Sequence, residues 1–143
     1  MEFASQAWSP WQAGDIETIE AVQKKMVRQV SGLKSSSYED RLAELGMETL
    51  EQRRRDQDMI QTFKIIRGHD DVDCRTWFSL IPEDRERSTR AAEGGLNLVG
   101  EASRLEMRRN FFSQRVVASW NRLPLATKNA KTVREFKNLL KKN

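Results

Sequence analysis

One short segment of the chain gathers His, Asp and Cys side chains. The string HDDVDC, residues 69–74, contains His69, Asp70, Asp71, Asp73 and Cys74. Such side chains can bind zinc, and a cysteine paired with a histidine can act as a nucleophile. His69 is the only histidine available to Cys74, and it lies in the same loop. Zinc sites use paired Cys or His spacings, and the rest of the chain supplies no second pair. We therefore interpret the segment as a polar turn, and expect no catalytic residue, no metal site and no cofactor.

The other sequence motifs of catalysis are absent. No P-loop, no GxGxxG and no GxSxG string occurs, and the glycines at 94–95 lack the lysine of a phosphate cradle. No apolar run of about 18 residues is present, so we expect no membrane partner. The single cysteine, Cys74, cannot form an internal disulfide, which favours an intracellular location in the nucleus or the cytoplasm. The sequence thus indicates a binding or structural protein and not an enzyme.

Positive charge is concentrated at one end of the chain. The formal net charge is +4, but residues 105–143 alone hold ten Lys or Arg and two acids. A basic block beside a mildly acidic region is a common pattern in proteins that contact nucleic acid. The alternative is that these cations only solvate the outer faces of helices.

Hydrophobic spacing predicts a mainly α fold, a small helical bundle with an irregular middle segment. The first helix is expected at 15–31, with Asp15 as its N-cap, Gly32 at its end and an inward apolar stripe. That stripe comprises Ile16, Ile19, Met26 and Val30, with Val22 close by. A short helix at 38–45 would be capped by Ser37. A third would begin at Thr49 and run to 67, with Gln52 completing a capping box.

The middle and the C-terminal end are expected to differ in regularity. For the middle we predict a helical turn capped by Asp73 and an exposed charged loop at 83–95. A short β-hairpin is predicted to pair 96–99 with 104–107. Residues 110–122 suit a helix that buries one stripe, with a basic face on another side. The buried stripe comprises Phe112, Val116, Trp120 and Leu123. A last helix would begin at Thr132, with Glu135 completing a second capping box.

Several strings, taken in order, resemble the C-terminal region of Jockey-like LINE (non-LTR retrotransposon) reverse transcriptases. They are MEFASQAWSPWQAGDIETIEAVQKKMVRQVSGL, then SYEDRLAELGMETLEQRRRDQDMIQTFKIIRG, then DDVD, RRNFFSQRVVASWNRLP and TVREFKNLL. The resemblance covers nearly the whole chain. The family's catalytic hairpin with adjacent aspartates does not occur here, because Asp70 and Asp71 follow His69 in a polar turn. Met1 falls inside the family's segment, so the resemblance implies a truncated or excised fragment without catalytic activity.

The resemblance also implies a division into parts and a partner. Residues 1–68 correspond to a thumb-like helical region, 69–104 to an irregular connector and 105–143 to a basic C-terminal segment. A thumb holds the template–primer duplex through backbone-directed cations, so weak and sequence-tolerant binding of RNA or DNA is expected. The expected nucleic-acid-binding residues are Lys24, Lys25, Arg28, Arg53, Arg54, Arg108, Arg109, Arg115, Arg122, Arg134, Lys137 and Lys141.

Two alternatives stay open at this point. Apolar surfaces left by an absent palm domain would make the chain a module for a protein partner or for self-association. Trp8, Trp11, Trp77 and Phe111 are the candidate contacts in that case. The other alternative is a retrotransposon-derived product without function.

Overall fold

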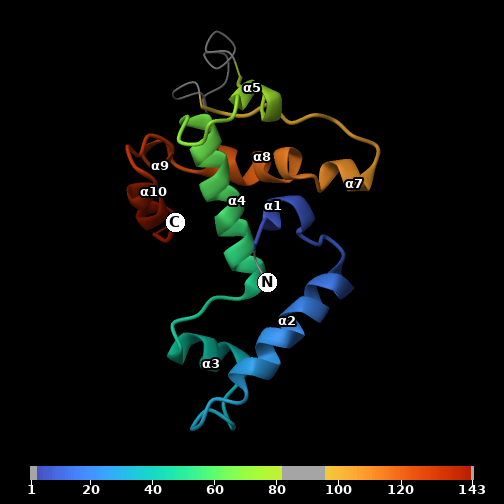
Figure 1. The fold of residues 1–143 in the computed structure, drawn as a ribbon, viewed down its shortest axis with the longest axis vertical. Helices are drawn as coiled ribbons and strands as arrows, with labels where there is room; N and C mark the ends of the chain where they lie inside the picture. The colour runs from blue at the N-terminus through green and yellow to red at the C-terminus, as the bar shows by residue number, and fades with distance from the viewer. Residues whose placement is uncertain (1–2, 82–95, 143) are drawn as a thin grey trace. The chain divides into compact units, whose positions relative to one another are not determined.

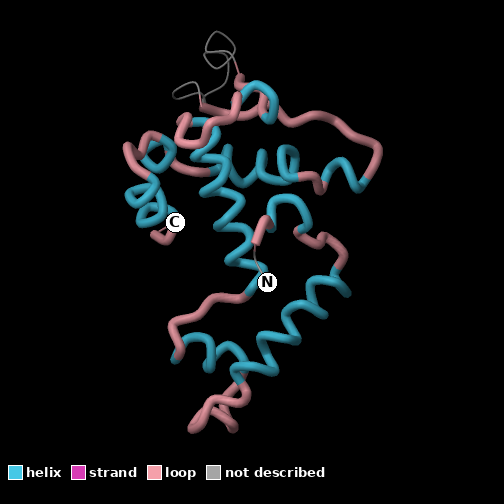
Figure 2. The backbone as a smooth tube through the Cα atoms, in the orientation of Figure 1, coloured by secondary structure: helices cyan, strands magenta, loops and turns pink. Residues whose placement is uncertain are grey.

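The computed structural model of the chain describes residues 3–81 and 96–142. In these residues the fold is mainly helical, as the sequence predicted (Figure 1), and Figure 2 shows the helices joined by loops. The predicted charged loop at 83–95 lies outside the described residues. The helices are α1 (Ser5–Trp8), α2 (Ala13–Val27), α3 (Tyr38–Glu44), α4 (Leu50–Ile66), α5 (Cys74–Trp77), α7 (Glu106–Arg109), α8 (Phe112–Arg122), α9 (Leu125–Lys128) and α10 (Val133–Leu140).

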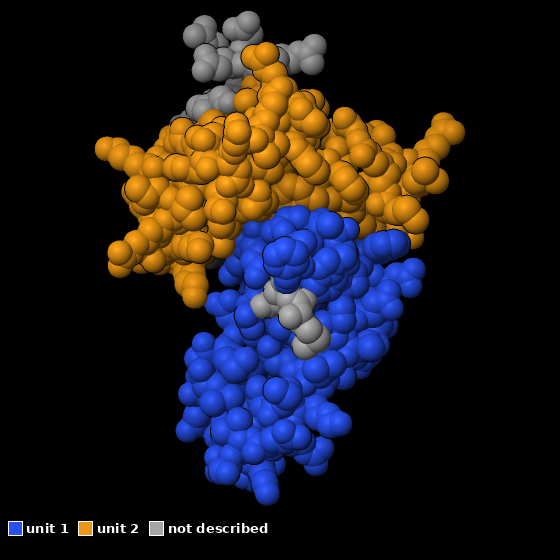
Figure 3. Space-filling model, in the orientation of Figure 1, with its two compact units in different colours: residues 1–57 blue, residues 58–143 orange. Residues whose placement is uncertain are grey.

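The chain forms two compact units, which Figure 3 colours separately. Unit 1 is Met1–Gln57 and unit 2 is Asp58–Asn143, so the boundary lies within α4. The sequence predicted three segments, 1–68, 69–104 and 105–143. The division differs because the two halves of α4 carry different side chains. Polar residues fill its first turns, whereas Met59, Phe63 and Ile65 in its last turns belong to the apolar core of unit 2.

Helix α2 of unit 1 departs from the prediction in its start and in its buried face. It begins at Ala13, two residues before Asp15, and its N-cap Gln12 makes no side-chain cap. It ends at Val27, five residues before Gly32. Ile16 and Ile19 of the predicted stripe are partly buried. Met26 and Val30 are 64% and 37% exposed, so the prediction was wrong for the second half of the stripe. Val22, close to the stripe, is 43% exposed. The buried residues of α2 are Glu20, Gln23 and Val27, and hydrogen bonds rather than apolar contact hold the two polar ones.

Helix α3 confirms the prediction at both ends. The Ser37 hydroxyl accepts a hydrogen bond from the Asp40 backbone N–H at 3.1 Å. At the other end Gly46 has φ 62°, the left-handed conformation in which glycine avoids a side-chain clash. The N–H of Gly46 donates to the carbonyl of Ala43 and that of Met47 to Leu42, which is the Schellman pattern. These two caps fix the length of α3 independently of its packing.

An aromatic core holds unit 2 together. Phe63 of α4 stacks on Phe136 of α10, with ring centroids 4.3 Å apart, and Trp120 of α8 lies 6.1 Å from Phe136. All three rings are fully buried, and the Trp120 indole N–H donates to the carbonyl of Leu96 at 2.7 Å. The predicted α8 stripe is confirmed at Phe112, Val116 and Trp120, while Leu123 packs against the core partly buried.

The predicted β-hairpin between 96–99 and 104–107 is wrong. Leu98 pairs antiparallel with Leu80, through hydrogen bonds from Ile81 N–H to the Asn97 carbonyl and from Val99 N–H to the Ser79 carbonyl. The other edge of Leu98 is satisfied by a side chain. The Asn121 amide accepts from the Leu98 N–H at 2.8 Å and donates to its carbonyl at 2.9 Å. A second strand has no free edge to join, and residues 106–109 form α7 instead.

The predicted capping residues of α4, α5 and α10 are in place. Thr49 and Thr132 each accept a hydrogen bond from the backbone N–H three residues later, and Asp73 accepts from the N–H of Arg75. The reciprocal halves of the two capping boxes differ from the prediction. Glu135 accepts from the N–H of Lys131, and Gln52 bonds Asp56.

Candidate nucleic-acid interface

An open groove of about 480 Å³ in unit 1 collects cations from three parts of the chain. Helix α2 contributes Lys24, Lys25 and Arg28, the connecting loop Lys34, and α3 Arg41. Ala21 and Tyr38 supply the remaining lining. Among the described residues that line the groove none is acidic, so its charge is uniformly positive. A concave surface lined by one sign of charge attracts an extended polyanion.

The helix dipole explains only part of this clustering. Lys24 and Lys25 lie in the last turn of α2 and Arg28 is its C-cap residue, where cations stabilise the negative end of a helix. Lys34 and Arg41 lie outside α2, so the dipole of that helix does not account for them. Their convergence on the same groove is a property of the turn between α2 and α3.

Local contacts hold the groove in shape. The Arg41 guanidinium donates to the carbonyls of Leu33 and Lys34 at 2.8 and 3.0 Å, which fixes the loop that carries Lys34. The ammonium of Lys24 lies 5.2 Å from the centre of the Tyr38 ring, a cation–π distance. Arg41 is thus partly occupied with the backbone, while Lys25, Arg28 and Lys34 are exposed.

Behind the groove lies a buried polar network that positions Tyr38. The Tyr38 hydroxyl donates to the Glu20 carboxylate and accepts from the Gln23 amide, at 3.0 Å for the latter. The same carboxylate accepts from the Leu50 N–H at 3.0 Å, and Gln23 also donates to the Glu48 carbonyl. Burial, and then the hydrogen bond to Glu20, raises the pKa of Tyr38 to about 12. The network connects α2, α3 and the first residue of α4 at one point.

The groove therefore contains three of the predicted binding residues, Lys24, Lys25 and Arg28. The other two from unit 1 lie elsewhere on α4. Arg53 is half-buried, and Arg54 is 3% exposed. Within the described part of the chain, neither terminal nitrogen of Arg54 has a hydrogen-bond partner. A buried guanidinium cannot reach a phosphate in this conformation, so the prediction for Arg54 needs correction.

Two predicted residues near the start of α8, Arg108 and Arg115, do not lie on one face. Helix α7 ends at Arg109, and the extended Phe111 separates Arg108 from α8. Arg108 bonds the Glu101 carboxylate at 3.1 Å, with both side chains about half exposed. Arg115 points inward, where it donates two hydrogen bonds to the nearly buried Asp58 carboxylate at 2.8 and 3.0 Å. This ion pair occupies Arg115, so we remove it from the candidate contacts.

The remaining predicted cations lie exposed on separate helices of unit 2. Arg109 belongs to α7 and Arg122 to the last turn of α8. Arg134 and Lys137 occupy the exposed side of α10, opposite the buried Phe136, and Lys141 is the C-cap of the same helix. Unit 2 therefore presents dispersed cations, in contrast to the groove of unit 1.

The His–Asp–Cys segment serves the structure of unit 2. Asp70 accepts from the Gln61 amide at 2.7 Å and lies 3.7 Å from the Lys64 ammonium. Asp73 caps α5, and the His69 ring lies 5.5 Å from Phe63. Across residues 3–81 and 96–142, no group of three His, Cys, Asp or Glu side chains is arranged to hold a metal ion.

Sequence reasoning missed three residues of the groove, Lys34, Tyr38 and Arg41. Their signal was the short connection between two helices, bounded by Gly32 with φ 90° and by the Ser37 cap. Such a connection returns the chain beside the end of α2. The first turns of α3 are thereby brought next to the last turn of α2.

Comparison with known proteins found no matching protein-family model, no matching curated protein and no matching solved structure. In the segments that the structure describes, none of the helices is long and apolar enough to cross a membrane.

Proposed function

We propose that this chain binds the sugar–phosphate backbone of nucleic acid through the basic groove of unit 1. The observation that carries the proposal is the convergence of five cations on one groove, three from α2, one from the loop and one from α3. Backbone contacts of this kind depend on charge and spacing and do not read bases. Binding is therefore expected to be sequence-tolerant and sensitive to salt.

The ordered resemblance to LINE reverse transcriptases supports the same proposal. The region that this chain resembles includes the thumb, which holds a template–primer duplex. Lys24, Lys25 and Arg28 lie in the string that carries the first part of the resemblance. The proposal assigns no catalytic role to the chain, because its residues are proposed to hold a backbone and not to transfer a group.

The experiment titrates labelled RNA and a labelled RNA–DNA duplex with the protein at about 50 and about 200 mM salt. We expect binding at low salt that weakens steeply at high salt, with a slope of log affinity against log salt of about −0.7 for each phosphate contact on single-stranded RNA. The combined variant Lys24→Gln, Lys25→Gln, Arg28→Gln should bind more weakly and with a shallower slope. Absence of binding at low salt by the unmodified protein would defeat the proposal.

A matched variant separates the groove from net charge. Arg134→Gln, Lys137→Gln, Lys142→Gln also removes two lysines and one arginine, but from exposed positions at the end of unit 2. We expect it to reduce affinity much less than the groove variant. Equal losses from the two variants would show that binding follows total charge, and the groove would then lose its assignment.

A second candidate function, self-association, is favoured by the outer face of α2. Val22 and Met26 lie one helical turn apart on α2 and are 43% and 64% exposed, and Val30, just beyond the helix, is 37% exposed. An apolar row of this kind is typical of a helix that packs on a partner. Sedimentation at several salt concentrations tests it. A dimer that persists in high salt and is lost in Met26→Glu supports this candidate, whereas a monomer under all conditions excludes it.

A further inference from the structure

Unit 2 contains two pairs of adjacent aromatic residues, Trp77–Phe78 and Phe111–Phe112, and in each pair one ring is buried and the other exposed. Phe78 and Phe112 are 4% and 3% exposed and pack edge to face, with centroids 5.8 Å apart. Their neighbours Trp77 and Phe111 are 38% and 44% exposed. Each pair thus places one ring inside and one outside, and the two outer rings come together. We call Trp77 and Phe111 the aromatic platform.

The platform has a defined geometry. The two rings are parallel to within 4°, and their centroids are 6.4 Å apart. Carbon atoms in direct stacking contact lie about 3.5–4.0 Å apart, so the centroid separation shows that the two parallel rings are offset from one another. Trp77 also meets the buried Phe112 edge to face at 6.2 Å, which anchors the platform to the core. Trp77 is 38% and Phe111 44% exposed, so both rings offer apolar surface to a group from outside.

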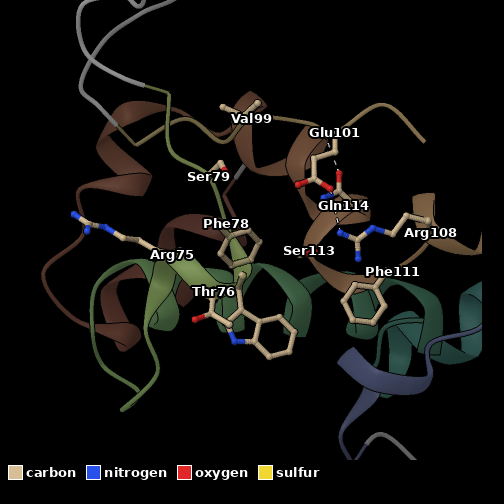
Figure 4. Close-up of a pocket in the computed structure, with 11 residues that line it drawn as sticks. Arg75, Thr76, Phe78, Ser79, Val99, Glu101, Arg108, Phe111, Ser113 and Gln114 are labelled. Atoms are coloured by element: carbon tan, nitrogen blue, oxygen red, sulfur yellow. Dashed lines mark hydrogen bonds and ion pairs between the residues drawn. The ribbon is translucent and has the colours of Figure 1, made fainter. Parts of the chain in front are cut away.

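A polar cleft of about 210 Å³ adjoins the platform (Figure 4). Trp77 and Phe111 are part of its lining, together with Ser79, Ser113 and Gln114. The Arg108 guanidinium lies 5.6 Å from the centre of the Phe111 ring, and Figure 4 shows it on the same side of the cleft as Glu101. The Arg108–Glu101 pair is about half exposed, and such surface pairs exchange partners at little cost.

The charge of the cleft selects among the ligands that bind aromatic rings. A cationic ligand, such as a methylated lysine, would meet the guanidinium of Arg108 beside the ring it needs. An unpaired nucleotide offers instead a flat base for the rings and a phosphate for the arginine. Stacking on aromatic rings and adjacent cations are the two elements of single-strand recognition. Bases in a duplex are already stacked, so they gain nothing from the platform.

We infer that the Trp77–Phe111 platform, with Arg108 beside it, is a binding site for an unpaired base of single-stranded nucleic acid. The site shares with the proposed function only its class of ligand, since it lies in unit 2 and the basic groove lies in unit 1. It adds base stacking to backbone contact. It would also give unit 2 a preference for single strands over duplexes.

The experiment compares two single-stranded DNA probes that differ only in their bases. One is an oligothymidylate of about 16 nucleotides, the upper end of the site size for one single-strand-binding fold. The other has the same backbone without bases. The unmodified protein should bind the base-bearing strand about 5- to 150-fold more tightly, the range of a single base–aromatic stack. Equal affinity for the two probes would overturn the inference.

Variants then locate the effect. Trp77→Leu and, separately, Phe111→Leu keep apolar bulk but remove a ring, and each should lower affinity for the base-bearing strand to near that for the abasic one. Trp11→Leu is the matched control, because Trp11 is 40% exposed but belongs to unit 1. Circular dichroism verifies folding. A preference for bases that survives both ring removals would contradict the assignment to the platform.

The two proposals fail in different ways. If the abasic strand and a duplex bind with a salt dependence that the groove variant reduces, while bases add no affinity, the platform fails and the groove stands. If only the base-bearing strand binds, and Trp77→Leu abolishes that binding, the groove fails and the platform stands. If no probe binds at low salt, both proposals fail.

Discussion

In unit 2 the buried side chains are mainly apolar, and three aromatic rings stack or lie close together at the centre. In unit 1 Val27, Leu42 and Leu50 are buried together with Ser5, Glu20, Gln23 and Arg54. The first arrangement derives stability from area removed from water, whereas the second depends on hydrogen bonds that must each be completed. The contrast shows that one helix, α4, joins two parts whose stability has different physical origins.

This difference also has a functional side. A hydrogen-bonded interior fixes the orientation of Tyr38, and through the loop contacts of Arg41 the groove keeps its cations in place. In unit 2 the buried or half-buried cations are held by partners within the unit, Arg115 by Asp58 and Lys128 by Asn97 and Asn121. The cations that remain exposed are spread over separate helices. The proposed backbone site and the proposed base site follow this division, with cations in unit 1 and rings in unit 2.

The largest effect is expected from the aromatic core. Phe136→Ala removes the ring that stacks on Phe63 and should lower the free energy of unfolding by about 3–5 kcal/mol, as large-to-small changes at buried aromatic positions do. Urea unfolding followed by circular dichroism measures the change. Arg134→Ala, at an exposed position of α10, should remain within about 0.5 kcal/mol of the unmodified protein. A loss below about 1 kcal/mol for Phe136→Ala would place the stability of unit 2 elsewhere.

The next effect tests the hydrogen-bonded interior of unit 1. Glu20→Ala leaves the Leu50 N–H and the Tyr38 hydroxyl without their acceptor and should cost about 1.5–3 kcal/mol, the range for hydrogen bonds to a charged group. Glu17→Ala on the exposed side of the same helix is the control and should have little effect. If both changes are neutral, the network does not stabilise unit 1, and the proposed difference in the origin of stability between the two units is wrong.

A smaller effect of opposite sign is expected at Arg54. Its guanidinium is buried with both terminal nitrogens unpartnered among the described residues, which destabilises the folded state. Arg54→Met keeps the length of the side chain and removes the charge, so the free energy of unfolding should rise by about 1 kcal/mol. Thermal denaturation measures the shift. A lower melting temperature would show that the arginine has a stabilising partner in solution.

The last effect is a pH dependence at Tyr38. Burial and the Glu20 hydrogen bond raise its pKa to about 12, above the ordinary tyrosine value of 10. The folded state therefore retains the proton between pH 10 and about 12, while the unfolded state loses it. The stabilisation is complete below pH 10 and declines as the pH rises through 12. Absorbance of tyrosinate reports this titration directly, and a midpoint near 10 would contradict the buried hydrogen bond.

The helices could be predicted because their signals are local. Features that depend on partners distant in the sequence could not be predicted. Ser37, Thr49, Asp73 and Thr132 cap helices as predicted, because each cap is decided within four residues. The inward face of α2 was missed, since hydropathy favours Val22 and Met26 over Glu20. Only the distant Tyr38 and Leu50 make burial of Glu20 favourable.

The candidate site shows the same limit. Lys24, Lys25 and Arg28 were predicted together because they share one helix, and Lys34 and Arg41 were missed because the turn brings them there. Arg115 was predicted as a surface cation from its spacing. Its partner Asp58 lies on another helix, and the sequence spacing on α8 carries no information about that residue.

The chain contains a single tyrosine and a single cysteine. The tyrosine, Tyr38, belongs to unit 1, and the cysteine, Cys74, packs against the core of unit 2. Burial raises the pKa of the Cys74 thiol, so alkylating reagents should react slowly until that core opens. The rate of thiol modification and the absorbance of tyrosinate therefore follow the two units separately, in one unlabelled sample of the native protein.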